Sequence, residues 1–204
     1  KVLSERWSAG ALLKRDVFST VERGRFRMDG AEVGAILRRL DQVPWWSRPL
    51  ANHLFRRERR ALAAIAGLQI APELLWAGRA ALVRGFIDGV ALHLARPEGD
   101  AAYFTTAKAV LRRLRRSGVC HNDLAKEQNW LRGADGKAYL TDFQLAACFA
   151  QRGKLFRILA YEDARRAGEL RHRAYLMVRG AEVFAGLKAA AVGTGFGDEW
   201  IRVG

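Results

Sequence analysis

The spacing of apolar residues changes along this chain, and that change limits the folds available to it more than any other feature. In residues 11–40, apolar and charged residues alternate, which is typical of β-strands, and Asp29-Gly30 in their midst predicts a hairpin turn. In residues 48–66 and 101–116, apolar residues recur every three or four positions, which predicts helices. Strands followed by helices indicate an α+β fold.

The remaining segments extend this order. Residues 72–75 and 80–86 predict a second hairpin, and residues 154–173 predict a last helix. At roughly 150 residues per domain, 204 residues suit one domain that is built from two lobes. We expect an N-lobe at residues 1–86, with an antiparallel sheet and one helix, and a shortened helical C-lobe at residues 87–204.

The charge of the chain calls for an anionic partner. The 35 Lys and Arg residues outnumber the 21 Asp and Glu residues, which gives a formal net charge of +14. Nucleotides, nucleic acids, anionic lipids and phosphorylated glycans are partners of this kind. No apolar run approaches the ~18 residues that span a bilayer. Residues 1–6 are not followed by an apolar segment, so we do not expect them to be part of a signal peptide. We expect a cytoplasmic monomer, with peripheral contact to the inner membrane face as an option.

Two short segments hold the residues best suited to chemistry. Residues 118–131 read G-V-C-H-N-D-L-A-K-E-Q-N-W-L, and T-D-F-Q begins ten residues later. Asp123 and Asp142 each follow a short apolar run, and Asn129 lies between them. A positioned carboxylate can take a proton from a hydroxyl group. Carboxylate and amide oxygens are also the ligands that Mg²⁺ prefers.

These segments resemble the catalytic loop H-R-D-L-x-x-x-N and the metal-binding D-F-G of the protein-kinase-like superfamily. The likeness is greatest to small bacterial and RIO-type branches, including lipopolysaccharide kinases. It implies a two-lobed kinase-like fold and transfer of the γ-phosphate of ATP, with Mg²⁺, to a hydroxyl of a protein Ser/Thr or an anionic glycan or glycolipid. It also implies that Asp123 is the base, that Lys126 meets the γ-phosphate, and that Asn129 and Asp142 bind the metal.

Three positions depart from the family pattern. Five residues separate the catalytic Asp from Asn129, whereas the family has four. One inserted residue, most simply Ala125, restores both the loop Lys and the Asn, but Gln128 is an alternative metal ligand. Asn122 replaces the Arg that often follows the His. We therefore do not expect regulation in which this position binds a phosphorylated activation loop. Gln144 replaces the Gly of D-F-G, which we expect to stiffen the segment.

The N-terminal half should supply a cation for the nucleotide phosphates. A-I-L-R at residues 35–38 resembles the family's V-A-I-K, with Arg38 in place of Lys. Glu58 is the only acid in its predicted helix and is therefore the expected partner of Arg38. Arg39 and, less well placed, Lys14 are alternatives. A further interpretation is that Arg38 and Glu58 are ordinary surface charges.

Two more segments resemble the family in their position along the chain but not in a specific motif. Residues 16–21 occupy the position of the family's glycine-rich loop, and the hydroxyl and backbone N–H groups of Ser19 and Thr20 could contact phosphate. Alternatively, these residues form a plain hairpin turn. The residues that resemble the hinge, where backbone groups meet adenine, are Gly85, Phe86 and Ile87. A strand that simply leads into a loop would read the same way.

Trp45 and Trp46 precede the basic segment 48–60. This pattern is found in helices that bind membrane interfaces, and also where a helix packs on a sheet, which we favour here. The sequence leaves a second functional class open: a non-catalytic pseudokinase that acts as a basic RNA- or membrane-binding module, with nucleic acid the less favoured partner. The glycine-rich residues 193–197 follow no strand and open no helix, so we expect a flexible tail there.

Overall fold

Five antiparallel strands form the largest sheet of the computed structural model, which describes residues 3–97 and 100–170. After a short 3₁₀ turn at Leu3–Glu5, the strands follow the order β1-β2-β3-β5-β4. Their bounds are Trp7–Arg15 (β1), Thr20–Met28 (β2), Ala31–Arg39 (β3), Leu74–Ala77 (β4) and Ala81–Gly85 (β5). Asp29 and Gly30 both have positive φ, as a tight turn between β2 and β3 requires.

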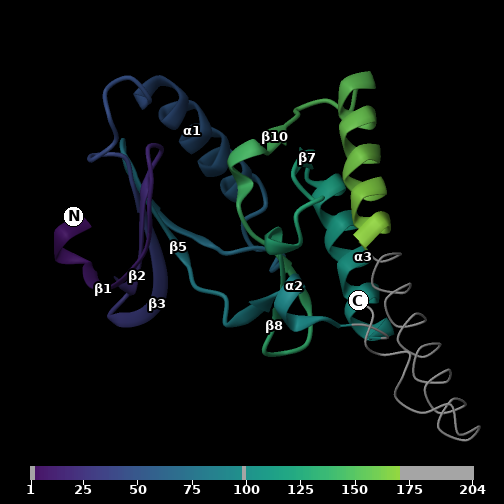
Figure 1. The fold of residues 1–204 in the computed structure, drawn as a ribbon, viewed down its shortest axis with the longest axis horizontal. Coiled ribbons are helices and arrows are strands. Elements are labelled where there is room, and N and C mark those ends of the chain that lie inside the picture. Colours follow the sequence, from purple (N-terminus) through teal and green to yellow (C-terminus); the bar gives the residue numbers. More distant parts are fainter. Residues whose placement is uncertain (1–2, 98–99, 171–204) are drawn as a thin grey trace, which may run out of the picture.

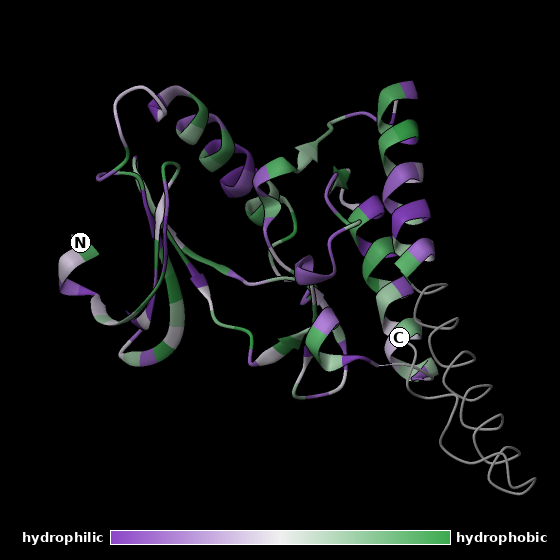
Figure 2. Cartoon of the chain, in the orientation of Figure 1, coloured by the Kyte–Doolittle hydropathy of each residue, from purple (hydrophilic) through white to green (hydrophobic). Residues whose placement is uncertain are grey.

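Helix α1 (Arg48–Ala64) packs on one face of this sheet (Figure 1). Its N-terminal half shares a hydrophobic cluster with the sheet, formed by Leu40, Val43, Ala51, Phe55 and Leu82. The sheet has another cluster of its own, formed by Phe26, Ala35, Leu37 and Val83. Polar residues cover much of the remaining surface of α1, so the helix appears in alternating colours in Figure 2.

The second half of the chain joins helices to short strands. Up to residue 170, its helices are α2 (Leu92–Ala95), α3 (Ala101–Arg116) and a helix over residues 154–170, which stands beside α3 in Figure 1. One small sheet has the order β6-β8-β9, and another pairs β10 with β7. These strands are Gly89–Ala91 (β6), Val119–Cys120 (β7), Trp130–Gly133 (β8), Ala138–Leu140 (β9) and Ala147–Cys148 (β10). The 3₁₀ turns Glu127–Asn129 and Phe143–Leu145 lie between them.

The largest hydrophobic cluster lies in this second half, but α1 contributes to it. Tyr103 and Leu114 of α3 join Leu140, Phe143 and Leu170 there. Leu62 and Ile65, at the end of α1, and Ile70 after it belong to the same cluster. Helix α1 therefore packs against the sheet at its start and against the helical half at its end.

The predicted α+β class is confirmed, and α3 has the predicted bounds. Helix α1 ends two residues earlier than predicted, β1 begins at Trp7 instead of near residue 11, and α2 and β10 were not predicted. The last helix is described only to residue 170, and residues 193–197 lie outside the described part. Within that part, no helix is both long and apolar enough to cross a membrane.

The expected packing of the tryptophan pair is wrong. Trp45 is 82% exposed and Trp46 is 59% exposed. The residue that seats the start of α1 is instead Ser47, which is buried and whose hydroxyl donates to the carbonyl oxygen of Val17 at 2.6 Å. The hydrophobic contact between α1 and the sheet begins only at Ala51 and Phe55.

Two glycines that follow helices offer a matched test of the fold. Gly67 and Gly118 have nearly the same φ, 75° and 74°, so alanine at either position costs about 1–2 kcal/mol of backbone strain. A Cβ at Gly67 meets nothing within 4 Å, whereas one at Gly118 would lie 2.5 Å from the carbonyl oxygen of Phe149. We predict that Gly118→Ala lowers the free energy of unfolding distinctly more than Gly67→Ala in urea denaturation. Equal losses would contradict the position of residue 149.

Candidate active site

Asp123, Lys126 and Asn129 share one hydrogen-bonded cluster in the loop after β7. Lys126 Nζ donates to Asp123 Oδ2 at 2.8 Å, and Asn129 Nδ2 donates to the same oxygen at 3.0 Å. Asn129 Nδ2 also donates to the backbone oxygen of Asp123 at 2.8 Å. The bond to Asp123 raises the pKa of Lys126, so the amine is a cation at neutral pH. The side chain of Lys126 is 60% exposed and can reach a ligand.

Ala125, the residue interpreted above as an insertion, lies on the outside of this loop. Leu124 is buried, and its carbonyl oxygen accepts a hydrogen bond from Trp130 Nε1 at 3.3 Å, while Ala125 is exposed in the turn that follows. Asn129 is buried against Asp123, whereas Gln128 is exposed. The structure thus brings Asn129 to Asp123 and leaves Gln128 outside.

Thr141 joins this loop to Asp142. Its backbone N–H donates to the carbonyl oxygen of Asn129 at 2.9 Å. Its own carbonyl oxygen lies 2.9 Å from His121 Nε2, and because a carbonyl only accepts, Nε2 carries the hydrogen. The ring of His121 also packs on Phe143, with the ring centroids 4.7 Å apart. Burial lowers the pKa of His121, so the ring is neutral and supports the loop instead of acting as a base.

Asp142 has two properties that suit a cation ligand. Its φ of 60° is left-handed, a conformation that costs a non-glycine residue energy and that is often retained at functional sites. Its Oδ1 is buried and has no hydrogen-bond partner within the described part of the chain. A buried carboxylate oxygen without a donor is unfavourable, and a bound cation would remove that cost.

The protein alone offers few ligands for a metal. Among residues 3–97 and 100–170, no group of three or more His, Cys, Asp or Glu side chains could hold an ion. Mg²⁺ is commonly bound through only one or two carboxylates, with substrate phosphates and water as its other ligands. Asp142 and the amide oxygen of Asn129, whose nitrogen is occupied by Asp123, meet that description.

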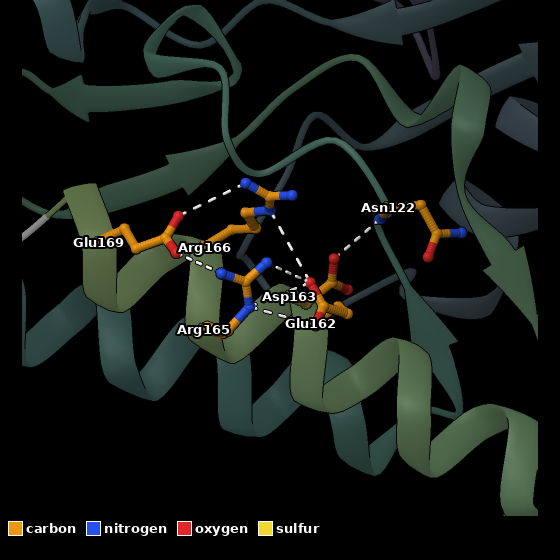
Figure 3. Close-up of polar contacts among 6 residues, drawn as sticks. All are labelled: Asn122, Glu162, Asp163, Arg165, Arg166 and Glu169. Atoms are coloured by element: carbon orange, nitrogen blue, oxygen red, sulfur yellow. Dashed lines mark hydrogen bonds and ion pairs between the residues drawn. The ribbon is translucent and has the colours of Figure 1, made fainter.

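The sequence reasoning missed Asp163, which fixes the start of the loop. Its Oδ2 accepts from the backbone N–H of His121 at 2.6 Å. Its Oδ1 accepts from the backbone N–H of Asn122 at 2.9 Å, and Figure 3 shows this second bond. Asn122 has a φ of 65°, so this carboxylate also holds a left-handed residue in place. Burial raises the pKa of Asp163. The usable clue was its spacing, because Asp163 lies seven residues from both Phe156 and Leu170, on the buried side of the helix.

The predicted pairing of Arg38 with Glu58 is confirmed. Arg38 Nη1 donates to Glu58 Oε2, and both side chains are buried, so the interpretation as surface charges is wrong. Arg39 pairs with Glu22 at 2.9 Å, and Lys14 pairs with Asp16 at 2.7 Å. Neither alternative cation is the partner of Glu58.

The pair belongs to a larger polar network that reaches Asp142. Arg38 Nη2 donates to Gln144 Oε1 at 3.0 Å, so the two departures from the family pattern contact each other. Arg84 Nη1 lies 3.5 Å from Glu58 Oε1 and 3.3 Å from the Thr141 hydroxyl. Arg84, another residue that the sequence reasoning missed, thus stands beside the segment that carries Asp142. Arg38 itself is only 2% exposed, and both its terminal nitrogens are engaged.

The turn between β1 and β2 and the segment after β5 are less open than predicted. Asp16 Oδ1 accepts from the backbone N–H groups of Phe18 and Ser19, each at 2.9 Å, and both Ser19 and Thr20 are buried. The N–H groups of two predicted hinge residues are also occupied: Gly85 donates to Glu73 at 2.8 Å and Phe86 to Gly34 at 3.0 Å.

Ile87, the third predicted hinge residue, is half-buried directly before the exposed Asp88. The backbone N–H groups of Ser19, Gly85 and Phe86 are therefore all occupied by other groups of the chain.

No protein-family model matches this chain, and no curated protein matches its sequence. The likeness to protein kinases therefore depends on the motif residues themselves, and it stays a prediction.

The buried ring of His121 predicts a pH dependence of stability. Because the folded-state pKa lies below the ordinary 6.5, the unfolded chain binds the proton more readily. The stability that the neutral ring contributes is fully present above pH 6.5. It is lost as the pH falls below 6.5, at up to about 1.4 kcal/mol per pH unit. We predict that replacing His121 with Asn flattens the fall in unfolding free energy between about pH 7 and 5.5. An unchanged slope would contradict a neutral buried ring; His53→Asn, at an exposed histidine, is the control.

Proposed function

We propose that this chain is an ATP- and Mg²⁺-dependent phosphotransferase of the protein-kinase-like type. The observation that supports this most directly is the hydrogen-bonded cluster of Asp123, Lys126 and Asn129, held beside Asp142 through the backbone of Thr141. The two halves of the chain, linked by α1, are compatible with a small two-lobed fold. The acceptor is a hydroxyl group on an anionic glycan or glycolipid or on a protein Ser/Thr, and the net charge of +14 favours an anionic one.

Asp123 would act as the base of the transfer. The acceptor oxygen bonds to the γ-phosphorus, the bond from that phosphorus to the β–γ bridging oxygen breaks, and ADP leaves. The hydroxyl proton passes to Asp123, whose Oδ2 already accepts two hydrogen bonds, so Oδ1 is the oxygen available to take it. Lys126, a cation with an exposed amine, would neutralise charge on the transferred phosphoryl group.

Asp142 and Asn129 would hold Mg²⁺, which neutralises charge on the nucleotide phosphates when it is bound. The unpartnered Oδ1 of Asp142 supports this assignment. The protein's own part is positional. His121 and Thr141 hold the backbone before Asp142, and Asp163 holds the backbone before Asp123. Phosphoryl transfer depends mainly on such positioning and on electrostatic stabilisation.

One observation favours the second candidate, a non-catalytic pseudokinase that acts as a basic binding module. The cation proposed for the nucleotide phosphates, Arg38, is buried and engaged by Glu58 and Gln144. A phosphate can meet Arg38 only if the Gln144 side chain moves away. The phosphotransferase requires the Arg38–Gln144 contact to open, whereas the pseudokinase does not.

Gln144→Ala tests whether the contact opens. The substitution leaves Arg38 Nη2 without its acceptor, so a phosphate oxygen can take that place. We predict that the variant binds Mg·ATP more tightly, by about threefold to tenfold, in calorimetric titration. Gln128→Ala, which removes an exposed glutamine from the same region, should bind like the wild type. Unchanged or weaker binding in Gln144→Ala would show that Arg38 does not meet the nucleotide.

The catalytic roles are tested with γ-labelled ATP and Mg²⁺, with and without a cell-envelope glycolipid or a generic protein acceptor. We predict that Asp123→Asn and Asp142→Asn each lower turnover by about 100-fold or more while the protein stays folded. Asp88→Asn, at an exposed carboxylate in the loop after β5, should keep wild-type turnover. Transfer and hydrolysis that do not exceed those of the two variants would contradict the proposal.

A further inference from the structure

An exposed apolar patch lies where α1 meets the turn between β1 and β2. Trp45 is 82% exposed, Trp46 59%, Leu50 50% and Val17 38%. The hydrogen bond from the Ser47 hydroxyl to the carbonyl oxygen of Val17, at 2.6 Å, holds the turn against the start of the helix. This contact brings Val17 next to the chain segment that carries Trp45, Trp46 and Leu50, and these four exposed residues are here called the tryptophan patch. Contiguous exposed apolar patches usually mark interaction sites.

The outward face of α1 continues this surface with positive charge. Glu58, the only acid in the helix, is buried and committed to Arg38, so the exposed side of α1 carries no carboxylate. In the described part of the chain, no carboxylate lies within ion-pair distance of its exposed arginines. These are Arg48, Arg56, Arg59 and Arg60. Figure 2 shows the hydrophilic residues along α1.

The tryptophan patch and the exposed arginines of α1 play no part in the proposed active site. The side of α1 that faces the site carries Glu58 and Arg57, and Arg57 donates to the carbonyl oxygens of Leu145 at 2.6 Å and Ala146 at 2.9 Å. The tryptophan patch lies at the opposite end of the helix from its contact with the helical half. Neither the packing of the core nor the proposed chemistry explains why the patch is exposed.

We propose that the tryptophan patch and the exposed arginines of α1 dock on an anionic lipid bilayer. Tryptophan is favoured at the headgroup level of membranes because it is apolar with one polar N–H group. An apolar end beside a cationic helix face is the arrangement by which helices bind a membrane surface. Anionic lipids attract the arginines. Leu50 and Val17 favour a bilayer over RNA, because aliphatic side chains add nothing to phosphate contacts or base stacking.

Vesicle flotation of the full chain tests this docking without ATP. We predict binding to vesicles of phosphatidylglycerol and phosphatidylcholine but not to vesicles of phosphatidylcholine alone. The double substitution Trp45→Ala/Trp46→Ala should weaken binding about tenfold or more, since two side chains lose their apolar contact. Arg56→Gln/Arg59→Gln should weaken it by about fivefold per arginine. Trp45→Phe/Trp46→Phe should retain most of the binding.

Two controls separate this docking from other causes. Ile158→Ala/Tyr161→Ala removes exposed apolar side chains from the helix over residues 154–170 and should bind vesicles like the wild type. Asp123→Asn should also bind normally, so failure of the proposed catalysis would leave this result intact. Equal binding by the tryptophan variant and the wild type would overturn the proposal. The proposal would also be overturned if the tryptophan variant bound vesicles normally but lost binding to single-stranded RNA, or lost self-association in sedimentation.

Discussion

The buried ion pair between Arg38 of β3 and Glu58 of α1 is the interaction on which the arrangement of this molecule depends. Charges buried away from water are stable only when they are paired. Removal of one partner from a buried ion pair typically lowers the free energy of unfolding by about 3–5 kcal/mol. The pair therefore fixes α1 against the sheet. Gln144 accepts a hydrogen bond from Arg38, Arg84 lies beside Glu58, and Arg84 also contacts Thr141. A contact between a strand and a helix thus extends to the residues on either side of Asp142.

The helical half positions the loop of Asp123 by an independent set of bonds. The Asp163 carboxylate receives two consecutive backbone N–H groups, and Thr141 uses both its backbone groups to join His121 to Asn129. These bonds offset the cost of two left-handed residues, Asn122 and Asp142. The candidate site is thus held by fixed backbone on both sides, as a reaction that depends on positioning requires.

Local features of the sequence predicted the local features of the structure. The hairpin at Asp29-Gly30 and helix α3 follow from turn chemistry and apolar spacing, and Glu58 could be paired with Arg38 because its helix holds no other acid. Asp163 and Arg84 were missed because only the folded chain brings them to the loop. The packing predicted for Trp45 was wrong because the local pattern does not distinguish a buried tryptophan from an exposed one. Gln144 was expected to stiffen its segment, but its contact with Arg38, distant in sequence, could not be predicted.

The central claim is that Asp142 helps to hold a nucleotide-bound metal ion. Mn²⁺ takes the same oxygen ligands as Mg²⁺, and its free form can be followed by electron paramagnetic resonance. We predict that the wild-type chain removes Mn²⁺ from solution when a non-hydrolysable ATP analogue is present, and that Asp142→Asn removes far less. Equal uptake by the two proteins, or no uptake beyond that of the nucleotide alone, would contradict a metal-dependent phosphotransferase site at this position.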